Sequence, residues 1–144
     1  MKLFAKKGIN HSDVVVVSPD HGSANRGRDV SSVFTNASLA VIDKRRPAPN
    51  QSEVTNVVGD TKGKVCFIVD DIIDTGGTVN NAVEALFRKG AKEVYVAATH
   101  AILSNDKLDP RIKELVVTDT VEKPIDGATV LTVADLIAKA IVSE

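Results

Sequence analysis

Residues 66–78 read CFIVDDIIDTGGT, and this stretch decides the fold that we expect. It opens with apolar residues that suit a strand buried on both faces, continues into two adjacent carboxylates, and ends in a run of small residues. A helix is predicted directly after it, because apolar residues from Val79 to Phe87 recur at helical spacing and Gly90 follows as a stop signal. A strand that leads through a glycine-rich turn into a helix is typical of a parallel sheet covered by helices.

The same alternation of strands and helices extends along the whole chain. Buried strands are predicted at 14–17, 65–69 and 94–98, and further strands at 39–42, 115–118 and 129–131. One more helix is expected to begin near Ala24, and a last helix over 133–141, opened by Thr132 with Asp135 as an acidic capping partner. Residues 1–13 resemble the end of a helix. The chain is therefore predicted to be one α/β domain over 1–144, with a mostly parallel sheet flanked by helices.

Composition excludes several classes of protein. The 144 residues carry a formal net charge of −1, so no overall cationic field would attract nucleic acid or an anionic membrane. Cys66 is the only cysteine, which excludes an internal disulfide framework and a cysteine-based zinc cluster. We expect a cytoplasmic protein, because no signal-peptide pattern or apolar run long enough to span a membrane is found.

The turn after the strand at 65–69 has the composition of a phosphate-binding site. In a parallel sheet, ligands bind beyond the carboxyl ends of the strands. Backbone N–H groups, two hydroxyls and a helix N-terminus favour an anion at residues 74–78, and carboxylates beside it suit sugar hydroxyls or Mg²⁺. The candidate residues are Asp70, Asp71, Asp74, Thr75, Gly76, Gly77 and Thr78. A simpler interpretation is an acidic turn in which the glycines are ordinary turn residues and Thr78 caps the helix.

Two other loops at the predicted carboxyl edge contain candidate residues. Asp20, His21 and Gly22 follow the strand at 14–17, where the small residues leave room for an anion and Asp20 can contact a metal. An N-capping Asp20 and a surface histidine are the simpler alternatives. After the strand at 39–42, Lys44 and Arg46 lie in a basic loop that contains two prolines and suits closure over phosphates; a solvated turn is again the simpler alternative.

Taken together, these motifs resemble the type I phosphoribosyltransferase superfamily and, within it, the ribose-phosphate pyrophosphokinase family. The resemblance rests on 66–78 and on four further segments in the same order: 15–20, 42–47, 58–64 and 90–100. It covers about Lys7 to Glu144 and corresponds to the C-terminal half of that family, without the ATP-binding N-terminal half. Ser23, Gly27 and the residues after His100 depart from the family pattern.

The resemblance implies a role for each candidate residue. Residues 74–78 would hold the 5-phosphate of ribose 5-phosphate, and Asp70 and Asp71 would bind the ribose hydroxyls and Mg²⁺. Asp20 would bind the magnesium that accompanies ATP, with His21 and Gly22 in the loop that receives the diphosphate. Lys44 and Arg46 would stabilise the charge on that diphosphate as catalytic residues.

The resemblance also implies an activity, which is transfer of diphosphate from ATP to ribose 5-phosphate, giving phosphoribosyl diphosphate and AMP. Because half of the family's chain has no counterpart here, we expect the 144 residues alone to catalyse little or nothing. A homo-oligomer is implied as well. Two alternatives remain: a small phosphoribosyltransferase that uses a nucleobase, and a non-catalytic regulatory or assembly subunit of a full-length synthetase.

Overall fold

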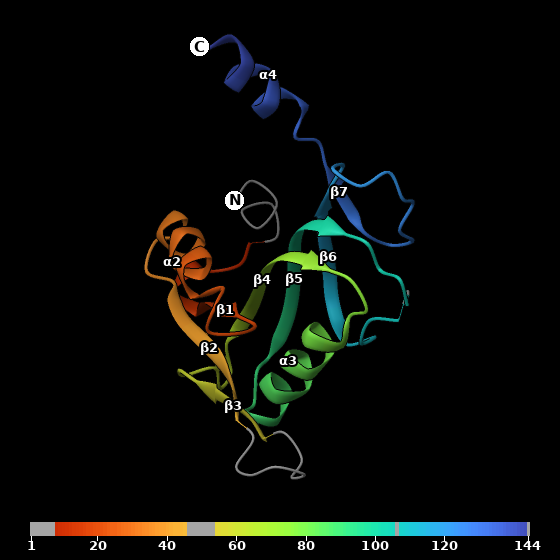
Figure 1. The fold of residues 1–144 in the computed structure, drawn as a ribbon. Coiled ribbons are helices and arrows are strands. Elements are labelled where there is room, and N and C mark those ends of the chain that lie inside the picture. The colour runs from red at the N-terminus through yellow and green to blue at the C-terminus, as the bar shows by residue number, and fades with distance from the viewer. Residues whose placement is uncertain (1–7, 46–53, 106, 144) are drawn as a thin grey trace.

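Seven strands form one sheet in the order β3-β2-β1-β4-β5-β6-β7 (Figure 1). The computed structural model describes residues 8–45, 54–105 and 107–143. All neighbouring strands run parallel except β2 and β3, which confirms the predicted α/β class with a mostly parallel sheet. The strands are β1 (Val14–Ser18), β2 (Ser38–Arg45), β3 (Val54–Val58), β4 (Val65–Ile73), β5 (Glu93–Ala101), β6 (Ile112–Thr118) and β7 (Thr129–Leu131).

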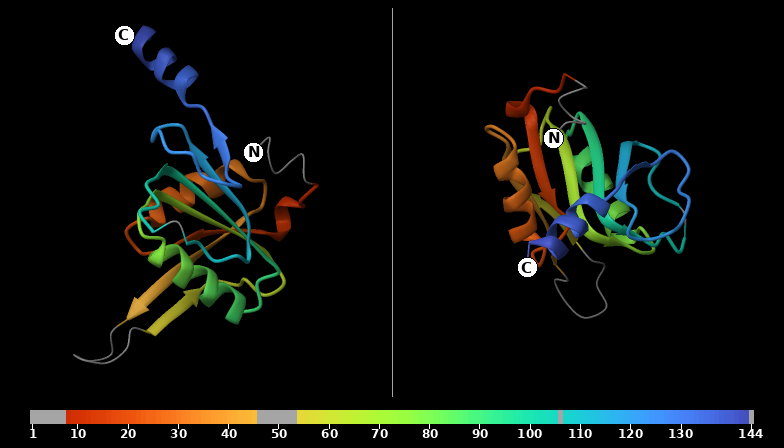
Figure 2. Two further views of the ribbon diagram at one scale, coloured as in Figure 1. Left: turned by 90° about the vertical axis from the view of Figure 1, so that its right-hand side faces the viewer. Right: turned by 90° about the horizontal axis from the view of Figure 1, so that it is seen from above.

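Helices α2 (Ala24–Val33) and α3 (Gly77–Arg88) pack on opposite faces of the sheet (Figure 2). The face under α3 contains Val15, Val17 and Ile68, and these residues form one apolar core with the buried side of that helix. The opposite face buries Val16 and other residues against Phe34, which lies at the end of α2. Side chains alternate between the faces along each strand, so the central strands need apolar residues at every position.

Strand β4 continues four residues beyond its predicted end. Register with β5 is maintained from Asp70, which pairs with Ala98, to Ile73, which pairs with Ala101. The two adjacent carboxylates therefore lie on the last residues of the strand and not in the loop. Backbone pairing with β5 overrides the low strand propensity of aspartate at this position.

The β2–β3 pair differs from the sequence prediction. Strand β2 extends to Arg45, and Lys44 pairs with Thr55 of β3, a strand that the sequence analysis did not predict. In the sequence Val-Thr-Asn-Val-Val of β3, the polar Thr55 and Asn56 interrupt both an apolar run and a strict alternation, so this pattern by itself does not indicate a strand. Lys44 thus lies on a strand and not in a loop, and Arg46 lies outside the described residues.

The C-terminal helix α4 (Ala134–Val142) is confirmed, but its capping and its setting differ in part from the prediction. The N-cap residue is Val133, which has no capping side chain, but Oγ1 of the preceding Thr132 accepts a hydrogen bond from the Ala134 N–H at 3.2 Å, so Thr132 does open the helix as predicted. The Val133 N–H donates a hydrogen bond of 2.9 Å to the side chain of Asp119, a residue near the end of β6. None of the residues of α4 is buried, and the helix projects from the sheet (Figure 1).

The start of the chain is described from Gly8 onward, so most of the predicted helix end at 1–13 lies outside the described residues. Within that segment, a short 3₁₀ helix, η1 (His11–Asp13), precedes β1. In the part of the chain that the structure describes, no helix has the length and apolar character needed to cross a bilayer.

Candidate functional site

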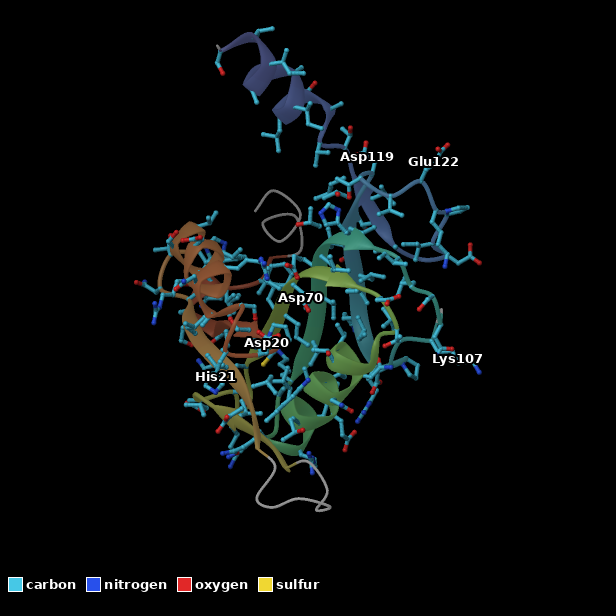
Figure 3. The ribbon with its side chains drawn as sticks, viewed as in Figure 1. Asp20, His21, Asp70, Lys107, Asp119 and Glu122 are labelled. Atoms are coloured by element: carbon cyan, nitrogen blue, oxygen red, sulfur yellow. The ribbon has the colours of Figure 1, made fainter. Side chains whose placement is uncertain are left out.

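The carboxyl ends of β1 and β4 enclose a hollow of about 270 Å³. Asp20 enters it from the loop after β1, and Asp70 from β4; the two side chains lie close together on the same side of the molecule (Figure 3). Residues 70–79 form the rest of its lining. The structure therefore brings together all seven candidates of the 66–78 stretch and one residue of the second loop.

A glycine is required at the centre of this turn. Gly76 has a φ of 80°, in the left-handed region that favours glycine. A Cβ atom at this residue would lie 2.8 Å from Cδ2 of Leu108. The next residue, Gly77, begins α3, whose first N–H groups have no carbonyl partner within the helix and are available to an anion.

The loop between β5 and β6 braces the turn from outside. The Ser104 N–H donates to the Asp74 carbonyl at 3.0 Å. Asn80, in the first turn of α3, donates its side-chain amide to the Lys107 carbonyl at 2.9 Å and accepts from the Asp109 N–H at 2.8 Å. These contacts fix the backbone of residues 74–80 without using the groups that face the hollow.

Asp70 and Asp71 have different environments although they are neighbours. The Asp70 side chain is 11% exposed and that of Asp71 is 55% exposed. Burial raises the pKa of Asp70 to about 6, and its hydrogen bond with Asp71 and the charges of Asp71 and Asp20 act in the same direction. The pKa of Asp71 is lowered, first by the hydrogen bond from Asp70 and then by the nearby Arg26. The pair therefore combines a readily ionised carboxylate with one that retains a proton in mildly acidic solution.

Arg26 is a site residue that sequence reasoning missed. From the first turn of α2 it reaches across to β4, where Nη2 lies 3.0 Å from Oδ2 of Asp71 and Nη1 lies 3.6 Å from Oδ1 of Asp70. The long stretch of chain between these residues gives no local pattern that could reveal the contact. The only available signal is an arginine near the start of a helix that follows a candidate loop.

The second loop is only partly directed at the hollow. Oδ1 of Asp20 accepts a hydrogen bond from the Ser23 N–H at 2.8 Å, so this carboxylate also stabilises the entry to α2. His21 does not line the hollow; its Nε2 lies 3.0 Å from Oδ1 of Asp43 on β2. Gly22 lies in the turn after His21 and does not line the hollow either.

Of the two predicted catalytic cations, the structure describes only Lys44. Lys44 is half-buried on β2 and does not line the hollow. Arg46 lies outside the described residues. Their catalytic role stays a prediction.

The acidic residues of the hollow suit Mg²⁺ with help from a ligand. Magnesium commonly takes one or two carboxylates from the protein and completes its octahedron with water and substrate oxygens. Asp70 and Asp71 provide two such groups, and Asp20 faces the same hollow. In the described ranges, no three acidic, histidine or cysteine side chains converge as a complete metal site. Asp70 and Asp71 are nevertheless oxygen donors of the kind that a partly hydrated magnesium ion uses.

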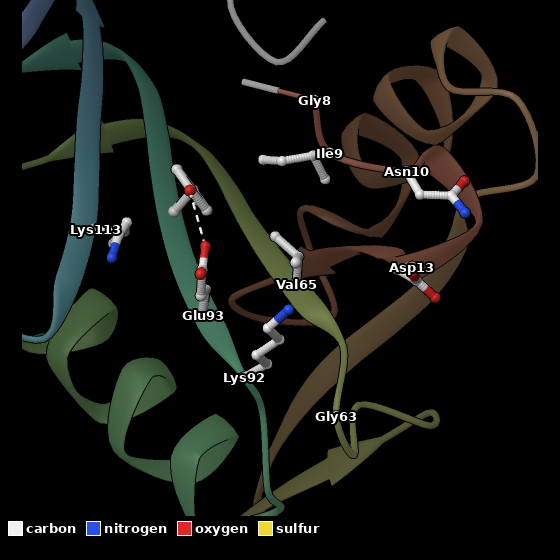
Figure 4. A pocket seen from close by; sticks show the side chains of 10 residues that line it. Gly8, Ile9, Asn10, Asp13, Gly63, Val65, Lys92, Glu93 and Lys113 are labelled. Carbon is white, nitrogen blue, oxygen red and sulfur yellow. Dashed lines mark hydrogen bonds between the residues drawn. The ribbon is translucent and has the colours of Figure 1, made fainter. Parts of the chain in front are cut away.

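A larger hollow of about 520 Å³ lies near the amino ends of the strands (Figure 4). Its charges are mixed, because Lys92 and Lys113 stand beside Asp13 and Glu93. Glu93 already accepts a hydrogen bond from the Tyr95 hydroxyl at 2.9 Å. The candidate site is therefore the smaller, acidic hollow at the carboxyl edge.

Cys66, the single thiol of the chain, is not a nucleophile. It is fully buried in the sheet, and burial raises the pKa of its thiol to about 12. The thiolate, which is the reactive form, is therefore negligible at neutral pH.

Comparison with known proteins gives relatives over nearly the entire chain. Ribose-phosphate pyrophosphokinases from Halalkalibacterium halodurans and Caldanaerobacter subterraneus are each 50% identical, over 98% and 97% of this chain. In both cases the match covers 46% of the relative, so the chain spans about half the length of these curated relatives.

Solved structures agree with this result. The crystal structure of phosphoribosylpyrophosphate synthetase from Mycobacterium smegmatis has a TM-score of 0.82 and 37% identity, covering 99% of this chain and 49% of that one. A purine phosphoribosyltransferase from Pyrococcus horikoshii has a TM-score of 0.52 at 21% identity, over 91% of this chain and 83% of that one, which shows a shared fold only. The family model for the phosphoribosyl transferase domain matches residues 2–135. With its seven-stranded sheet and its acidic, glycine-lined hollow, the chain belongs to the phosphoribosyl transferase domain family.

Proposed function

We propose that the chain is a ribose-phosphate diphosphokinase domain that binds ribose 5-phosphate in the acidic hollow. In the complete reaction, the 1-hydroxyl of the sugar attacks the β-phosphorus of ATP, and phosphoribosyl diphosphate and AMP are formed. The names of the relatives and their identity to this chain support the reaction class. The same proposal includes a cytoplasmic location and assembly into a homo-oligomer. It also includes the expectation that the chain binds neither nucleic acid nor a membrane.

One observation carries the proposal. The hollow places the N-terminus of α3 and the Gly76 turn next to two carboxylates that stand on the end of β4. A phosphate needs the first of these features, because helix N–H groups bind anions. Vicinal sugar hydroxyls need the second, because ionised carboxylates are strong hydrogen-bond acceptors. A phosphorylated pentose is a ligand that presents both groups at once.

Residues of the hollow and the two basic residues predicted from the sequence have parts in this proposal. Thr75 and Thr78 donate their hydroxyls to the phosphate, while Asp71 accepts from the ribose hydroxyls. Bound Mg²⁺ supplies charge neutralisation for the phosphate oxygens. Asp20 stands where the diphosphate arrives, and Lys44 and Arg46 stabilise the charge transferred. Positioning and electrostatics are the main sources of acceleration in this kind of transfer, so no covalent nucleophile is needed.

Titration calorimetry with ribose 5-phosphate in the presence of Mg²⁺ tests the binding step. We expect the parent protein to bind, and Asp71→Ala and Thr78→Val to bind at least about tenfold more weakly, because a hydrogen bond to a charged group contributes about 1.5–3 kcal/mol. Matched controls are Asp135→Ala and Thr35→Val, which change the same residue types at exposed positions outside the hollow.

The controls should bind like the parent. If neither the parent nor any variant releases or absorbs heat with the sugar, the binding proposal is wrong. Equal affinity in the parent and in both site variants would place the sugar elsewhere. Ribose without the phosphate serves as a ligand control and should bind far more weakly.

A further inference from the structure

Arg26 contacts both carboxylates of the acidic pair, Asp70 and Asp71. The guanidinium bridges Asp70 and Asp71, with N–O distances of 3.6 Å and 3.0 Å. It comes from a different element, α2, than the residues that it joins. It therefore places a positive charge beside the pair of oxygens that a divalent cation would use.

Close packing of α2 brings Arg26 to this position. The adjacent Gly27 is buried, and a Cβ atom there would overlap the Ser18 side chain and lie 2.9 Å from Cδ1 of Leu39. The helix backbone is thus drawn close to β1 and β2 at this point. With the backbone fixed, the Arg26 side chain spans the distance to the end of β4.

The neighbouring Arg28 has a different environment. Its Nη1 donates to Oδ1 of Asn25 on the same helix at 3.3 Å. Two residues along a helix correspond to a rotation of about 200°, so the two arginines point to opposite sides. Arg28 therefore carries the same charge as Arg26 and lies on the same helix, but it does not contact the acidic pair.

Electrostatics predicts a consequence for metal binding. The Coulomb interaction of a cation with a carboxylate in contact is far stronger at the partly dehydrated end of β4 than in bulk water. A guanidinium in contact with the carboxylates neutralises part of the charge that attracts a cation and repels that cation directly. Exposed ion pairs often contribute little to stability, so the effect should appear in ligand affinity more than in folding.

We propose that Arg26 is a positioning residue that acts as an internal counter-ion for Asp70 and Asp71 and competes with a divalent cation for them. In the ligand-free protein it keeps the two carboxylates together and makes binding of the metal alone weak. The metal binds well when the sugar phosphate adds its own oxygen ligands. Only this last point rests on the proposed function; the competition itself concerns the protein and the metal.

Binding of Mn²⁺ without any sugar tests the competition. Free Mn²⁺ is counted by electron paramagnetic resonance at low ionic strength for the parent, Arg26→Met, Arg26→Lys and Arg28→Met. We expect Arg26→Met to bind Mn²⁺ about tenfold more tightly than the parent, which equals about 1.4 kcal/mol. Arg26→Lys retains the charge and should stay within about threefold of the parent. Arg28→Met lowers the net charge by the same amount and should leave the affinity unchanged.

The sign of the change separates the proposal from a purely structural role. If Arg26 only maintained the shape of the site, its loss would lower the affinity for Mn²⁺ or leave it unchanged. Either result in a folded Arg26→Met protein overturns the proposal. Circular dichroism melting establishes that the variant is folded. An equal gain of affinity in Arg28→Met also overturns it, because general charge would then be the cause. Sugar binding is measured separately, so failure of the proposed function does not affect this result.

Discussion

At the scale of one residue, the surroundings of Asp70 disfavour the charged form of its carboxylate. Its carboxylate is largely removed from water and faces two further acidic residues, Asp71 and Asp20. The charged form is disfavoured, and the pKa rises to about 6. An ionised Asp70 is useful to a cation or a sugar hydroxyl, but it destabilises the folded protein when neither is bound.

The variant Asp70→Asn should therefore be more stable than the parent at neutral pH. Because the folded pKa is raised from 3.8 to about 6, the native state holds more protons than the unfolded chain between these values, and stability of the parent falls as the pH rises through this window. We expect the melting temperature of Asp70→Asn to exceed that of the parent by about 2–4 °C at a pH of about 7.5, which corresponds to about 1 kcal/mol.

The advantage should shrink as the pH falls through about 6 and vanish near a pH of about 4. Thermal melts with a chelator at several pH values provide the measurement. Asp135→Asn, on the exposed α4, is the control and should show no such trend. A constant difference between Asp70→Asn and the parent across this range would contradict the assignment.

At the scale of elements, the β2–β3 pair depends on a close approach of backbones. Gly59 follows β3 with a φ of 130°. A Cβ atom there would lie 2.7 Å from Cβ of Ala40 and 3.1 Å from the Leu39 carbonyl oxygen, both in β2. These atoms belong to a strand that is paired on both sides and cannot move aside. The same strand carries Asp43, which holds His21, and Lys44.

Replacement of Gly59 should destabilise the folded protein. We expect Gly59→Ala to lower the free energy of unfolding by about 2–4 kcal/mol, from backbone strain and steric overlap together. Gly63→Ala is the matched control, because Gly63 also has a positive φ, of 70°, but no atom lies within 4 Å of the point that a Cβ would occupy there. The control should lose about 1–2 kcal/mol. Urea unfolding gives both values, and equal losses would show that overlap with β2 has no effect.

The whole molecule has an acidic, glycine-lined hollow on a chain that spans about half the length of the curated relatives that it matches. Apolar residues of α4 face water, with Leu136 68% and Ile141 71% exposed. Of the two predicted catalytic cations, Lys44 does not reach the hollow, and Arg46 lies outside the described residues. Under the proposed function the sugar would bind in this hollow, whereas transfer of diphosphate would also need ATP placed in line with the sugar.

We expect the purified 144-residue chain to bind ribose 5-phosphate but to form almost no AMP from ATP. The reason is geometric: transfer requires both reactants in line, and misplacement of one reactant removes most of the acceleration. Chromatographic detection of AMP, with a full-length ribose-phosphate pyrophosphokinase as the positive control, provides the measurement. AMP formation by the chain at a rate near that of the full-length enzyme would overturn this expectation.

The sequence alone determined the parts of this protein that depend on local pattern. The continuous apolar runs of β1 and β4, the apolar stripe of α3 and the acidic, glycine-rich residues 70–78 are all readable without the fold, because strand burial, helix period and turn chemistry are properties of neighbouring residues. The resemblance to the phosphoribosyltransferases followed from the same stretch, and the family match confirms it.

Tertiary structure decided what depends on residues far apart in the chain. Only packing of α2 against the sheet brings Arg26 to Asp70 and Asp71, and only pairing with β5 extends β4 through the two carboxylates. Pairing with β3 likewise places Lys44 on a strand, and β2 gives His21 its partner Asp43. The physical reason is that each of these contacts forms between two segments that are distant in the sequence. Its energy depends on both segments together, so the local pattern of one segment does not identify its partner.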